Sequence, residues 1–253
     1  MQDPRGILIT GASSGIGAAL AMAYAGPGVS LALGGRDADR LEAVAAACRQ
    51  RGAAVRPAVV DVTDRAAMAR LIEEVDGAAP IDLVIANAGI GVGATDGIET
   101  EEQTRGVFGV NLDGTFNTVL PVIPKLVARR RGQIALVSSL ASFRGLPGSP
   151  TYCGSKAALR VWGEGLRGDM HPCGVEVSVI CPGFVASRIT ARNQFPMPFL
   201  MSAERAAAIV KRGLARNRGR IAFPFPMYFA IWLLGTLPPL LTDPLLMRLA
   251  KKQ

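Results

Sequence analysis

The chain of 253 residues is 49% hydrophobic and 19% charged, so it can bury a sizeable core and does not have the composition of a disordered chain. Its length fits one α/β domain. The net charge of +8 is uneven: residues 1–200 carry 19 basic and 18 acidic side chains, whereas residues 201–253 carry 9 and 2, which excludes a basic character spread over the whole fold.

Short apolar runs alternate with helical stretches in the first third of the chain. The apolar runs predict strands at residues 6–10, 29–33, 55–60 and 81–86, and the sequence between them predicts helices at residues 15–25, 37–51 and 64–75. Apolar strands separated by helices are typical of a parallel sheet that is covered on both faces. Because β-α-β crossovers are right-handed, the pattern predicts a doubly wound α/β sheet.

The rest of the chain continues this alternation. Residues 184–200 show no period and carry several Pro and Met residues, which predicts a mobile loop. The whole pattern predicts a single Rossmann-type domain over residues 1–253 with about seven parallel strands. In this domain residues 184–201 would form a substrate loop, and residues 223–253 an apolar and basic C-terminal extension. The further elements expected are a helix at residues 101–130 interrupted around Pro121 and Pro124, a strand at 133–138, a helix at 152–170, a strand at 175–181, a helix at 203–216 and a short strand near Ile221.

The turn between the first predicted strand and helix has the sequence T-G-A-S-S-G-I-G at residues 10–17. Glycines let the chain turn sharply and let the backbone approach a pyrophosphate, while the helix N-terminus offers free N–H groups and partial positive charge. The position at the first strand–helix junction is that of a dinucleotide-binding loop. The candidate cofactor contacts in this loop are Gly11, Ser13, Ser14, Gly15, Ile16 and Gly17.

The end of the second predicted strand favours NADP(H) over NAD(H). An acidic residue at this strand tip would bind the ribose 2′-hydroxyl of NAD, whereas here Gly34 and Gly35 precede Arg36, which suits a 2′-phosphate. The alternative is that Arg36 is only solvated and that Asp37 caps the next helix. After the third strand, Asp61 and Val62 are candidates for contacts with the adenine.

Tyr152 and Lys156 are four residues apart on a predicted helix, so both side chains lie on one face. An isolated tyrosine is a poor base at neutral pH, and a nearby ammonium group favours its phenolate and lowers its pKa. The pair alone is weak support, because this spacing occurs by chance in many helices. Ser139 strengthens it, because this serine ends the preceding strand at the edge where open α/β sheets bind ligands.

The chain resembles the short-chain dehydrogenases/reductases of about 250 residues over nearly its full length. The resemblance is carried by the motifs at residues 10–17, 87–89 and 182–183, together with Asn111, Ser139, Tyr152 and Lys156. It implies that Tyr152 is the general acid/base, that Lys156 lowers the pKa of Tyr152 and binds the nicotinamide ribose, and that Ser139 holds the substrate oxygen. Asn111 would support a water-mediated proton relay to Lys156. The further cofactor contacts that the resemblance implies are Asn87, Ala88, Gly89, Pro182, Gly183, Val185 and Ser187.

Two positions depart from the family pattern. Ser142 stands where a glycine is common, three residues after the serine of the site. Ser187 replaces the usual threonine and keeps a hydroxyl, so its contact with the cofactor is expected to persist. Cys153, next to the candidate tyrosine, is either a pocket residue or a small packing residue, and we favour packing.

The C-terminal extension is very apolar from Phe223 to Leu241, but four prolines interrupt it. A helix that spans a bilayer needs about 20 uninterrupted apolar residues, so a crossing is not expected. Two interpretations remain: a helix that packs on the substrate pocket or on another subunit, which we favour, and a peripheral membrane anchor. The basic residues that flank the apolar run in the sequence support the anchor. They are Lys211, Arg212, Arg216, Arg218, Arg220, Arg248, Lys251 and Lys252.

The cysteines and the histidine exclude two kinds of site. Cys48, Cys153, Cys173 and Cys181 form no C-x-x-C pair, and the single His171 without a cysteine cluster cannot build a zinc site, so no metal is expected. No signal peptide is recognised at the start, so we expect a reduced, cytoplasmic location, with a possible contact to the inner face of a membrane. We also expect a homodimer or homotetramer, and no nucleic acid as partner, since no reader motif accompanies the basic residues.

The sequence therefore predicts an oxidoreductase that interconverts a carbonyl and a secondary alcohol with NADP(H), on a small hydrophobic substrate. The apolar extension and the Met and Phe residues at 195–201 indicate the hydrophobic substrate. One alternative is a protein that senses NADP(H) without turnover, but such a sensor needs none of the proton-transfer groups. A second alternative, an epimerase or dehydratase of nucleotide sugars, usually carries a larger C-terminal domain, for which this chain has no room.

Overall fold

The computed structural model describes residues 1–91, 98–188, 190–192 and 196–250. Within them, seven strands form one sheet in the order β3-β2-β1-β4-β5-β6-β7, and every neighbouring pair is parallel. The predicted seven-stranded parallel sheet is thus confirmed, and its strands begin and end within two residues of the expected positions. The strands are β1 (Gly6–Thr10), β2 (Ser30–Gly35), β3 (Ala54–Val59), β4 (Leu83–Ala86), β5 (Gly132–Val137), β6 (Val175–Pro182) and β7 (Arg220–Phe223).

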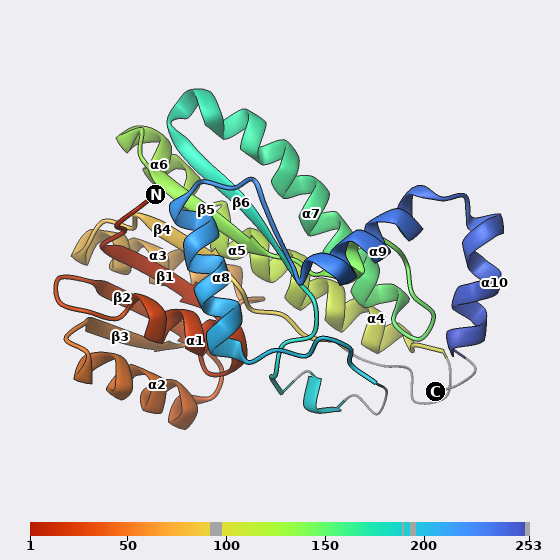
Figure 1. Ribbon diagram of the computed structural model, residues 1–253. Helices are drawn as coiled ribbons and strands as arrows, with labels where there is room; N and C mark the ends of the chain where they lie inside the picture. The colour runs from red at the N-terminus through yellow and green to blue at the C-terminus, as the bar shows by residue number, and fades with distance from the viewer. Residues whose placement is uncertain (92–97, 189, 193–195, 251–253) are drawn as a thin grey trace.

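Helices cover both faces of the sheet (Figure 1). One apolar cluster joins one face of the sheet to α1, α2 and α8, and a second joins the other face to α3, α5, α6 and α7. Alternate residues of β1 serve the two clusters, since Ile7 and Ile9 belong to the first and Leu8 to the second. The helices are α1 (Gly15–Tyr24), α2 (Ala38–Gln50), α3 (Arg65–Ala78), α4 (Glu101–Phe108), α5 (Gly114–Val119), α6 (Ile123–Arg129), α7 (Pro150–Met170), α8 (Ala203–Ala215), α9 (Phe225–Thr236) and α10 (Pro239–Ala250).

The strand order reverses at β1, which lies between β2 and β4. At such a point the loops that follow neighbouring strands turn to opposite faces and leave a crevice at the carboxyl edge of the sheet. The glycine loop follows β1 and residues 87–89 follow β4, so both border this crevice. The topology alone therefore brings two of the predicted motifs together.

The helix expected at residues 101–130 is wrong as one element. It is divided into α4, a π-helical turn at Gly109–Asp113, α5 and α6. A turn at residues 120–122 separates α5 from α6, in agreement with the interruption expected at Pro121. The spacing of apolar residues in the sequence does not reveal the π-helical turn, because this turn adds one residue without changing which residue types are buried.

Residues 184–201 connect β6 to α8. A 3₁₀ turn at Thr190–Arg192 interrupts this segment, and a single parallel bridge joins Val185 to Met201. Residues 189 and 193–195 lie outside the residues that the structure describes. The expected mobility of the segment stays a prediction.

The C-terminal extension forms α9 and α10, at the end of the molecule that is remote from β3 (Figure 1). Met227, Tyr228 and Ile231 on one side of α9 pack against a small apolar cluster around Leu140. The opposite side of α9 exposes Phe225 and three further large apolar residues. These outward residues of α9 are Phe225, Phe229, Trp232 and Leu233.

The basic residues near the extension in the sequence do not all surround it in space. Arg216 and Arg218 precede β7 and lie at the amino edge of the sheet, whereas α9 follows β7 at the carboxyl edge. The Arg220 guanidinium is held by Glu164 and by the Tyr228 hydroxyl. Lys251 and Lys252 lie outside the described residues. Within the described part of the chain, no helix is long and apolar enough to cross a membrane.

Candidate active site

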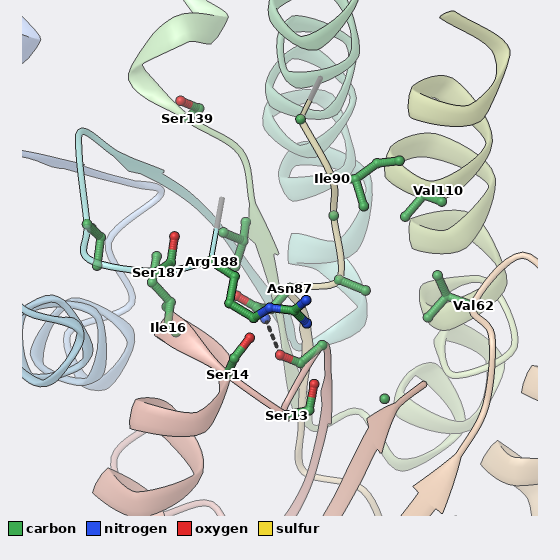
Figure 2. A pocket seen from close by; sticks show the side chains of 18 of the residues that line it. Ser13, Ser14, Ile16, Val62, Asn87, Ile90, Val110, Ser139, Ser187 and Arg188 are labelled. Atoms are coloured by element: carbon green, nitrogen blue, oxygen red, sulfur yellow. Dashed lines mark hydrogen bonds between the residues drawn. The ribbon is translucent and has the colours of Figure 1, made fainter. Parts of the chain in front are cut away.

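A cavity of about 520 Å³ opens at the carboxyl edge of the sheet. Figure 2 shows side chains from the glycine loop, the loops after β4 and β6 and the start of the chain after β5 converging on it. It brings together every predicted site residue except Gly17 and Asn111, which lie behind its wall. The predicted residues that line it are Gly11, Ser13, Ser14, Gly15, Ile16, Arg36, Asp61, Val62, Asn87, Ala88, Gly89, Ser139, Tyr152, Lys156, Pro182, Gly183, Val185 and Ser187.

The glycine loop uses its glycines for conformation and for close approach. Gly11 and Gly15 have φ angles of 66° and 56°, which favour glycine over any residue with a Cβ. A Cβ on Gly17 would overlap the Gly11 carbonyl oxygen and lie 2.6 Å from Nδ2 of Asn87. Gly17 therefore supports the loop from behind. The first residues of α1, Gly15 and Ile16, line the cavity, and the N–H groups of a first helical turn have no partner within the helix.

Asn87 fixes the glycine loop against the loop that follows β4. Its Nδ2 donates to the carbonyl oxygens of Thr10 and Gly11 at 3.0 and 3.1 Å. In return, the backbone N–H groups of Asn87 and Ala88 donate to Oγ1 of Thr10, both at 3.2 Å. The two bonds from Nδ2 engage the side chain of Asn87 with the glycine loop, so its part in the cavity is to shape that loop.

Arg36 and Asp61 lie together at the far end of the cavity, after β2 and β3. Arg36 Nη1 is 3.6 Å from Asp61 Oδ2, and the Arg36 side chain is 66% exposed, so the pair is loose and solvated. Hydrogen bonds from Thr63 lower the pKa of Asp61, with a smaller contribution from Arg36. Asp61 is thus ionised at neutral pH, and Arg36 can turn to another anion at little cost.

Asp37 caps α2, as one interpretation of the sequence held. Its Oδ1 accepts from the backbone N–H of Arg40 at 3.0 Å, and its other oxygen pairs with Arg40 Nη2 at 2.7 Å. Arg40 also lines the cavity, and its Nε is buried with no hydrogen-bond partner among the described residues. A second guanidinium therefore accompanies Arg36, which sequence reasoning missed.

Ser139 and Tyr152 meet at the other end of the cavity. Ser139 lies two residues after β5 and has an extended backbone, and its Oγ accepts from the backbone N–H of Ala141 at 3.1 Å. Its hydroxyl donates to the Pro182 carbonyl oxygen at 3.5 Å and lies close enough to the Tyr152 phenol to lower the pKa of that phenol. Tyr152 reaches this point from the first turn of α7, which begins at Pro150, two residues before the expected start, because proline fits the first turn of a helix.

Lys156 follows Tyr152 by one turn of α7 and is almost fully buried, with 4% of its surface exposed. Its Nζ donates to the Val137 carbonyl oxygen at 2.9 Å and lies 5.8 Å from the centre of the Tyr152 ring. Burial lowers the pKa of Lys156 to about 8. The amine is therefore close to its titration point at neutral pH and is already oriented by β5.

The expectation that Lys156 lowers the pKa of Tyr152 stays a prediction. In this structure burial raises the pKa of Tyr152, and the Ser139 hydroxyl offsets only part of that effect. Removal of the phenol from water disfavours the charged phenolate. The amine of Lys156 is bound to the Val137 carbonyl oxygen and has a lowered pKa of its own. Tyr152 is thus a protonated acid at neutral pH.

Asn111 is fully buried in the π turn between α4 and α5. Its Nδ2 donates to Ser155 Oγ at 2.9 Å and to the Ile90 carbonyl oxygen at 3.1 Å, and its Oδ1 accepts from Ile90 N–H at 2.8 Å. Ser155 in turn donates to the Tyr152 carbonyl oxygen at 2.8 Å. A Cβ on Gly89 would lie 3.1 Å from Asn111 Oδ1 and 3.2 Å from Lys156 Nζ, so these two polar atoms flank the same glycine.

The loop after β6 closes the cavity opposite the glycine loop. A Cβ on Gly15 would lie 3.1 Å from the Ser187 Cβ, so the two loops face each other closely. A Cβ on Gly183 would lie 2.9 Å from the Met227 sulfur and 3.4 Å from a methyl of Leu140. The C-terminal helix α9 therefore packs beside Gly183 through Met227, which itself does not line the cavity.

Several residues that line the cavity were not expected from the sequence. Arg40 could have been found, because it lies one turn into the helix that Asp37 caps. Ile90 and Val110 carry no chemical signal, and Arg188 lies in the segment without a period. The unexpected lining residues are Gly35, Asp37, Arg40, Val60, Ile90, Gly91, Val110, Val137, Ser138, Arg188 and Thr190.

Comparison with known proteins gives the same assignment as the site. The family model for the short chain dehydrogenase matches residues 5–196. An uncharacterized oxidoreductase of Myxococcus xanthus is 40% identical over 94% of this chain and 95% of its own length. A short-chain dehydrogenase from Sphingobium yanoikuyae in complex with NADPH has a TM-score of 0.81 and 28% identity, covering 87% of this chain and 88% of its own.

A short-chain dehydrogenase/reductase from Burkholderia phymatum in complex with NAD has a TM-score of 0.84 and 26% identity, covering 92% of this chain and 94% of its own. The two solved relatives hold different dinucleotides, so likeness alone does not decide between them. The family match covers most of the chain and the relatives cover nearly all of it. The protein is an oxidoreductase of the short-chain dehydrogenase family.

Proposed function

We propose that the protein interconverts a carbonyl and a secondary alcohol with NADP(H), with Tyr152 as the general acid/base. The observation that carries this proposal is the meeting of Ser139, Tyr152 and Lys156 in one cavity with the glycine loop. A hydroxyl pair within hydrogen-bond reach can hold and protonate an oxyanion. A dinucleotide-binding loop in the same cavity supplies the complementary half of a redox site.

The residues present fit a nicotinamide dinucleotide. Glycines stand where a side chain would fill the space between the facing loops, as at Gly15 and Gly89. Gly11, Gly15 and the start of α1 would hold the diphosphate, and Lys156 would bind the nicotinamide ribose. The nicotinamide, when bound, supplies or accepts the hydride.

Arg36 and Arg40 support NADP(H) over NAD(H). No carboxylate stands at the tip of β2 in the position that would bind a ribose 2′-hydroxyl, because Gly34 and Gly35 end that strand. Arg36 is only loosely paired, and the buried Nε of Arg40 has no partner among the described residues. Two guanidinium groups at the adenosine end suit a 2′-phosphate, which accepts several charge-assisted hydrogen bonds.

Three side chains of the site would carry out the proton transfer to the substrate oxygen. The Ser139 hydroxyl holds the substrate oxygen, and the Tyr152 phenol donates its proton to that oxygen as negative charge develops there. The raised pKa of Tyr152 keeps the phenol protonated at neutral pH, which suits reduction. Lys156, beside the Tyr152 ring, stabilises the phenolate that remains until a proton returns.

The wall beside Gly183 supports an apolar substrate. Met227 and Leu140 approach the lining residue Gly183 from outside the cavity, and α9, to which Met227 belongs, carries no charged side chain. A substrate with a charged group at this position would lose hydration without gaining a partner. We therefore expect a hydrophobic carbonyl compound.

The test of the mechanism is Tyr152→Phe. Removal of the acid should lower the rate of carbonyl reduction about 100-fold to 10,000-fold, the range typical of general acid catalysis. NADPH binding, followed by fluorescence titration, should remain within about twofold, since the ring is kept. Tyr228→Phe, at a tyrosine outside the cavity, is the matched control and should leave turnover unchanged. Unchanged turnover in Tyr152→Phe would overturn the mechanism.

The test of the cofactor is Arg36→Asp. This variant should weaken NADPH binding about tenfold to 100-fold and should leave or improve NADH binding, because a carboxylate repels the 2′-phosphate. Arg218→Asp, at an exposed position before β7, makes the same charge change away from the cavity and serves as control. A ratio of NADPH to NADH affinity that does not move in Arg36→Asp would overturn the assignment of Arg36.

A further inference from the structure

Arg188 is a cation that neither the family motifs nor the proposed mechanism uses. It follows Ser187 in the segment after β6 and lines the cavity. Figure 2 shows its side chain reaching into the cavity and not away from it. Its side chain therefore faces the same space as the glycine loop.

The backbone that carries Arg188 is fixed on both sides by hydrogen bonds. The Thr190 hydroxyl donates to the Val185 carbonyl oxygen at 2.8 Å and accepts from the Ser187 N–H at 2.9 Å. The bridge from Val185 to Met201 closes the base of the same loop. Ser187 lies against Gly15, the first residue of α1. The backbone of Arg188, the next residue, is therefore close to the start of that helix.

The charges around the cavity single out Arg188. Among the lining cations, Arg36 pairs with Asp61 and Arg40 with Asp37, while Lys156 is bound by the Val137 carbonyl oxygen. Arg188 has no ion pair within the described part of the chain. The glycine loop itself, residues 10–17, contains no basic side chain. A diphosphate at the start of α1 would carry two negative charges, which the partial charge of a helix end offsets only in part.

We propose that Arg188 forms an ion pair with the diphosphate of the dinucleotide and so joins the 184–201 segment to the bound cofactor. This inference rests on the proposed dinucleotide binding and extends it. Arg36 would discriminate by the 2′-phosphate, whereas Arg188 would bind the group that NADP(H) and NAD(H) share. The two arginines thus have separable effects on ligands that differ in one phosphate.

The test is Arg188→Ala, with binding measured by fluorescence titration and calorimetry on the full chain. Binding of NADPH, of NADH and of adenosine 5′-diphosphate should weaken by the same factor, about tenfold, as expected for loss of one charge-assisted contact. Adenosine, which lacks the diphosphate, should bind as to the wild-type protein. Arg188→Lys keeps the charge without the planar fork, so it should recover part of the affinity.

Two controls separate this role from others. Arg36→Ala should weaken the binding of NADPH alone and leave that of NADH and adenosine 5′-diphosphate unchanged. Arg218→Ala, outside the cavity, should change the binding of none of the three. Added salt should weaken the binding of adenosine 5′-diphosphate more steeply in the wild-type protein than in Arg188→Ala, because one screened ion pair is missing from the variant. A loss of folding alone would not produce this ligand pattern.

The inference would be overturned by unchanged affinities in Arg188→Ala. It would also be overturned by tighter binding, which would mean that the side chain only fills the space that the ligand needs, or by an effect confined to NADPH, which would assign Arg188 to the 2′-phosphate. A wild-type protein that binds neither dinucleotide would overturn the proposed function as well. Dinucleotide binding with an inert Arg188 would overturn this inference alone.

Discussion

The glycine loop lines the cavity, whereas the C-terminal helix α9 lies beside one lining residue, Gly183, and the two regions are built by opposite means. The loop relies on backbone, on positive φ angles at Gly11 and Gly15 and on four hydrogen bonds between the loops after β1 and β4. Helix α9 is apolar on both sides and contacts the site through Met227. In the glycine loop, backbone atoms occupy the space around the glycines. Beside Gly183, flexible side chains such as that of Met227 occupy it.

This difference predicts that substitutions are tolerated less well in the glycine loop than in α9. Backbone atoms cannot move without displacing a strand, so an added methyl group in the loop has no room. Thioether and aliphatic side chains can repack at modest cost. The following predictions test this contrast, from the largest expected effect to the smallest.

Gly17→Ala should give the largest effect. The added Cβ would overlap the Gly11 carbonyl oxygen and approach Asn87 Nδ2 to 2.6 Å, so the loop must shift away from its dinucleotide-binding form. We expect the affinity for NADPH to fall more than about 100-fold and the free energy of unfolding to fall by about 1–3 kcal/mol.

Fluorescence titration and urea unfolding measure the two quantities. Gly77→Ala is the matched control, since it adds the same methyl group to α3 where no atom lies within 4 Å, and it should raise stability slightly. Normal NADPH binding by Gly17→Ala would contradict the claim that backbone packing leaves no room for a methyl group in the glycine loop.

Lys156→Met should abolish most turnover and yet stabilise the fold. The lowering of the Lys156 pKa from 10.5 to about 8 corresponds to a cost of about 3 kcal/mol for the buried ammonium, and loss of the bond to Val137 costs about 1 kcal/mol. The net expectation at pH 7 is a gain of about 2 kcal/mol in the free energy of unfolding. Chemical unfolding of both proteins measures the difference.

The lowered pKa of Lys156 also predicts how the free energy of unfolding depends on pH. Below pH 8 the amine is protonated in both states of the wild-type protein, and between about pH 8 and 10.5 the folded state releases a proton that the unfolded state keeps. Wild-type stability should therefore gain from Lys156 as the pH rises through this window. The Lys156→Met protein should lack this gain, and parallel pH profiles of the two proteins would contradict the assignment.

Met227→Ala should affect the substrate and spare the cofactor. Removal of the thioether beside Gly183 should raise the KM for an apolar carbonyl compound severalfold and lower the free energy of unfolding by about 1 kcal/mol. The affinity for NADPH should not change. Steady-state kinetics with a series of ketones measures the first effect, and Met247→Ala on the exposed side of α10 is the matched control. An equal loss for apolar and polar ketones would remove Met227 from the substrate wall.

The outward residues of α9 should give the smallest effect. Phe229→Ser with Trp232→Ser removes two exposed rings whose centroids lie 6.1 Å apart. We expect a stability change within about 0.5 kcal/mol and unchanged reduction of a water-soluble ketone. Ile231→Ser, on the packed side of the same helix, should destabilise the protein measurably. A large loss in the double variant would show that another surface covers these rings. Co-sedimentation with anionic liposomes tests the predicted membrane contact with the same pair of proteins.

The sequence was sufficient where function depends on residue type and order. Strands, the glycine loop and the grouping of Ser139 with Tyr152 follow from apolar runs and from the rule that ligands bind at the carboxyl edge of a parallel sheet. Spacing alone also placed Lys156 one turn from Tyr152. It could not show that Val137 would bind the Lys156 amine, because that carbonyl belongs to β5 and reaches Lys156 only through the tertiary fold.

Other parts of the site have no local signal at all. The π turn that orients Asn111 inserts one residue into a helix whose apolar pattern looks continuous. Arg188 lies in a stretch without periodicity, so its direction depends on the hydrogen bonds of Thr190 and on the contact of Ser187 with Gly15. Met227 is 44 positions beyond Gly183 in the sequence, and only β7 and the start of α9 bring the two together.

The contact between Met227 and Gly183 has a consequence for how this protein can diverge. The family model ends at residue 196, so Met227 and the rest of α9 lie outside the part of the chain that this model matches. If the proposed substrate wall is correct, substitutions in α9 should alter the range of substrates while the proposed proton-transfer groups stay as they are. We expect exchange of α9 between relatives to change specificity and to leave the chemistry in place.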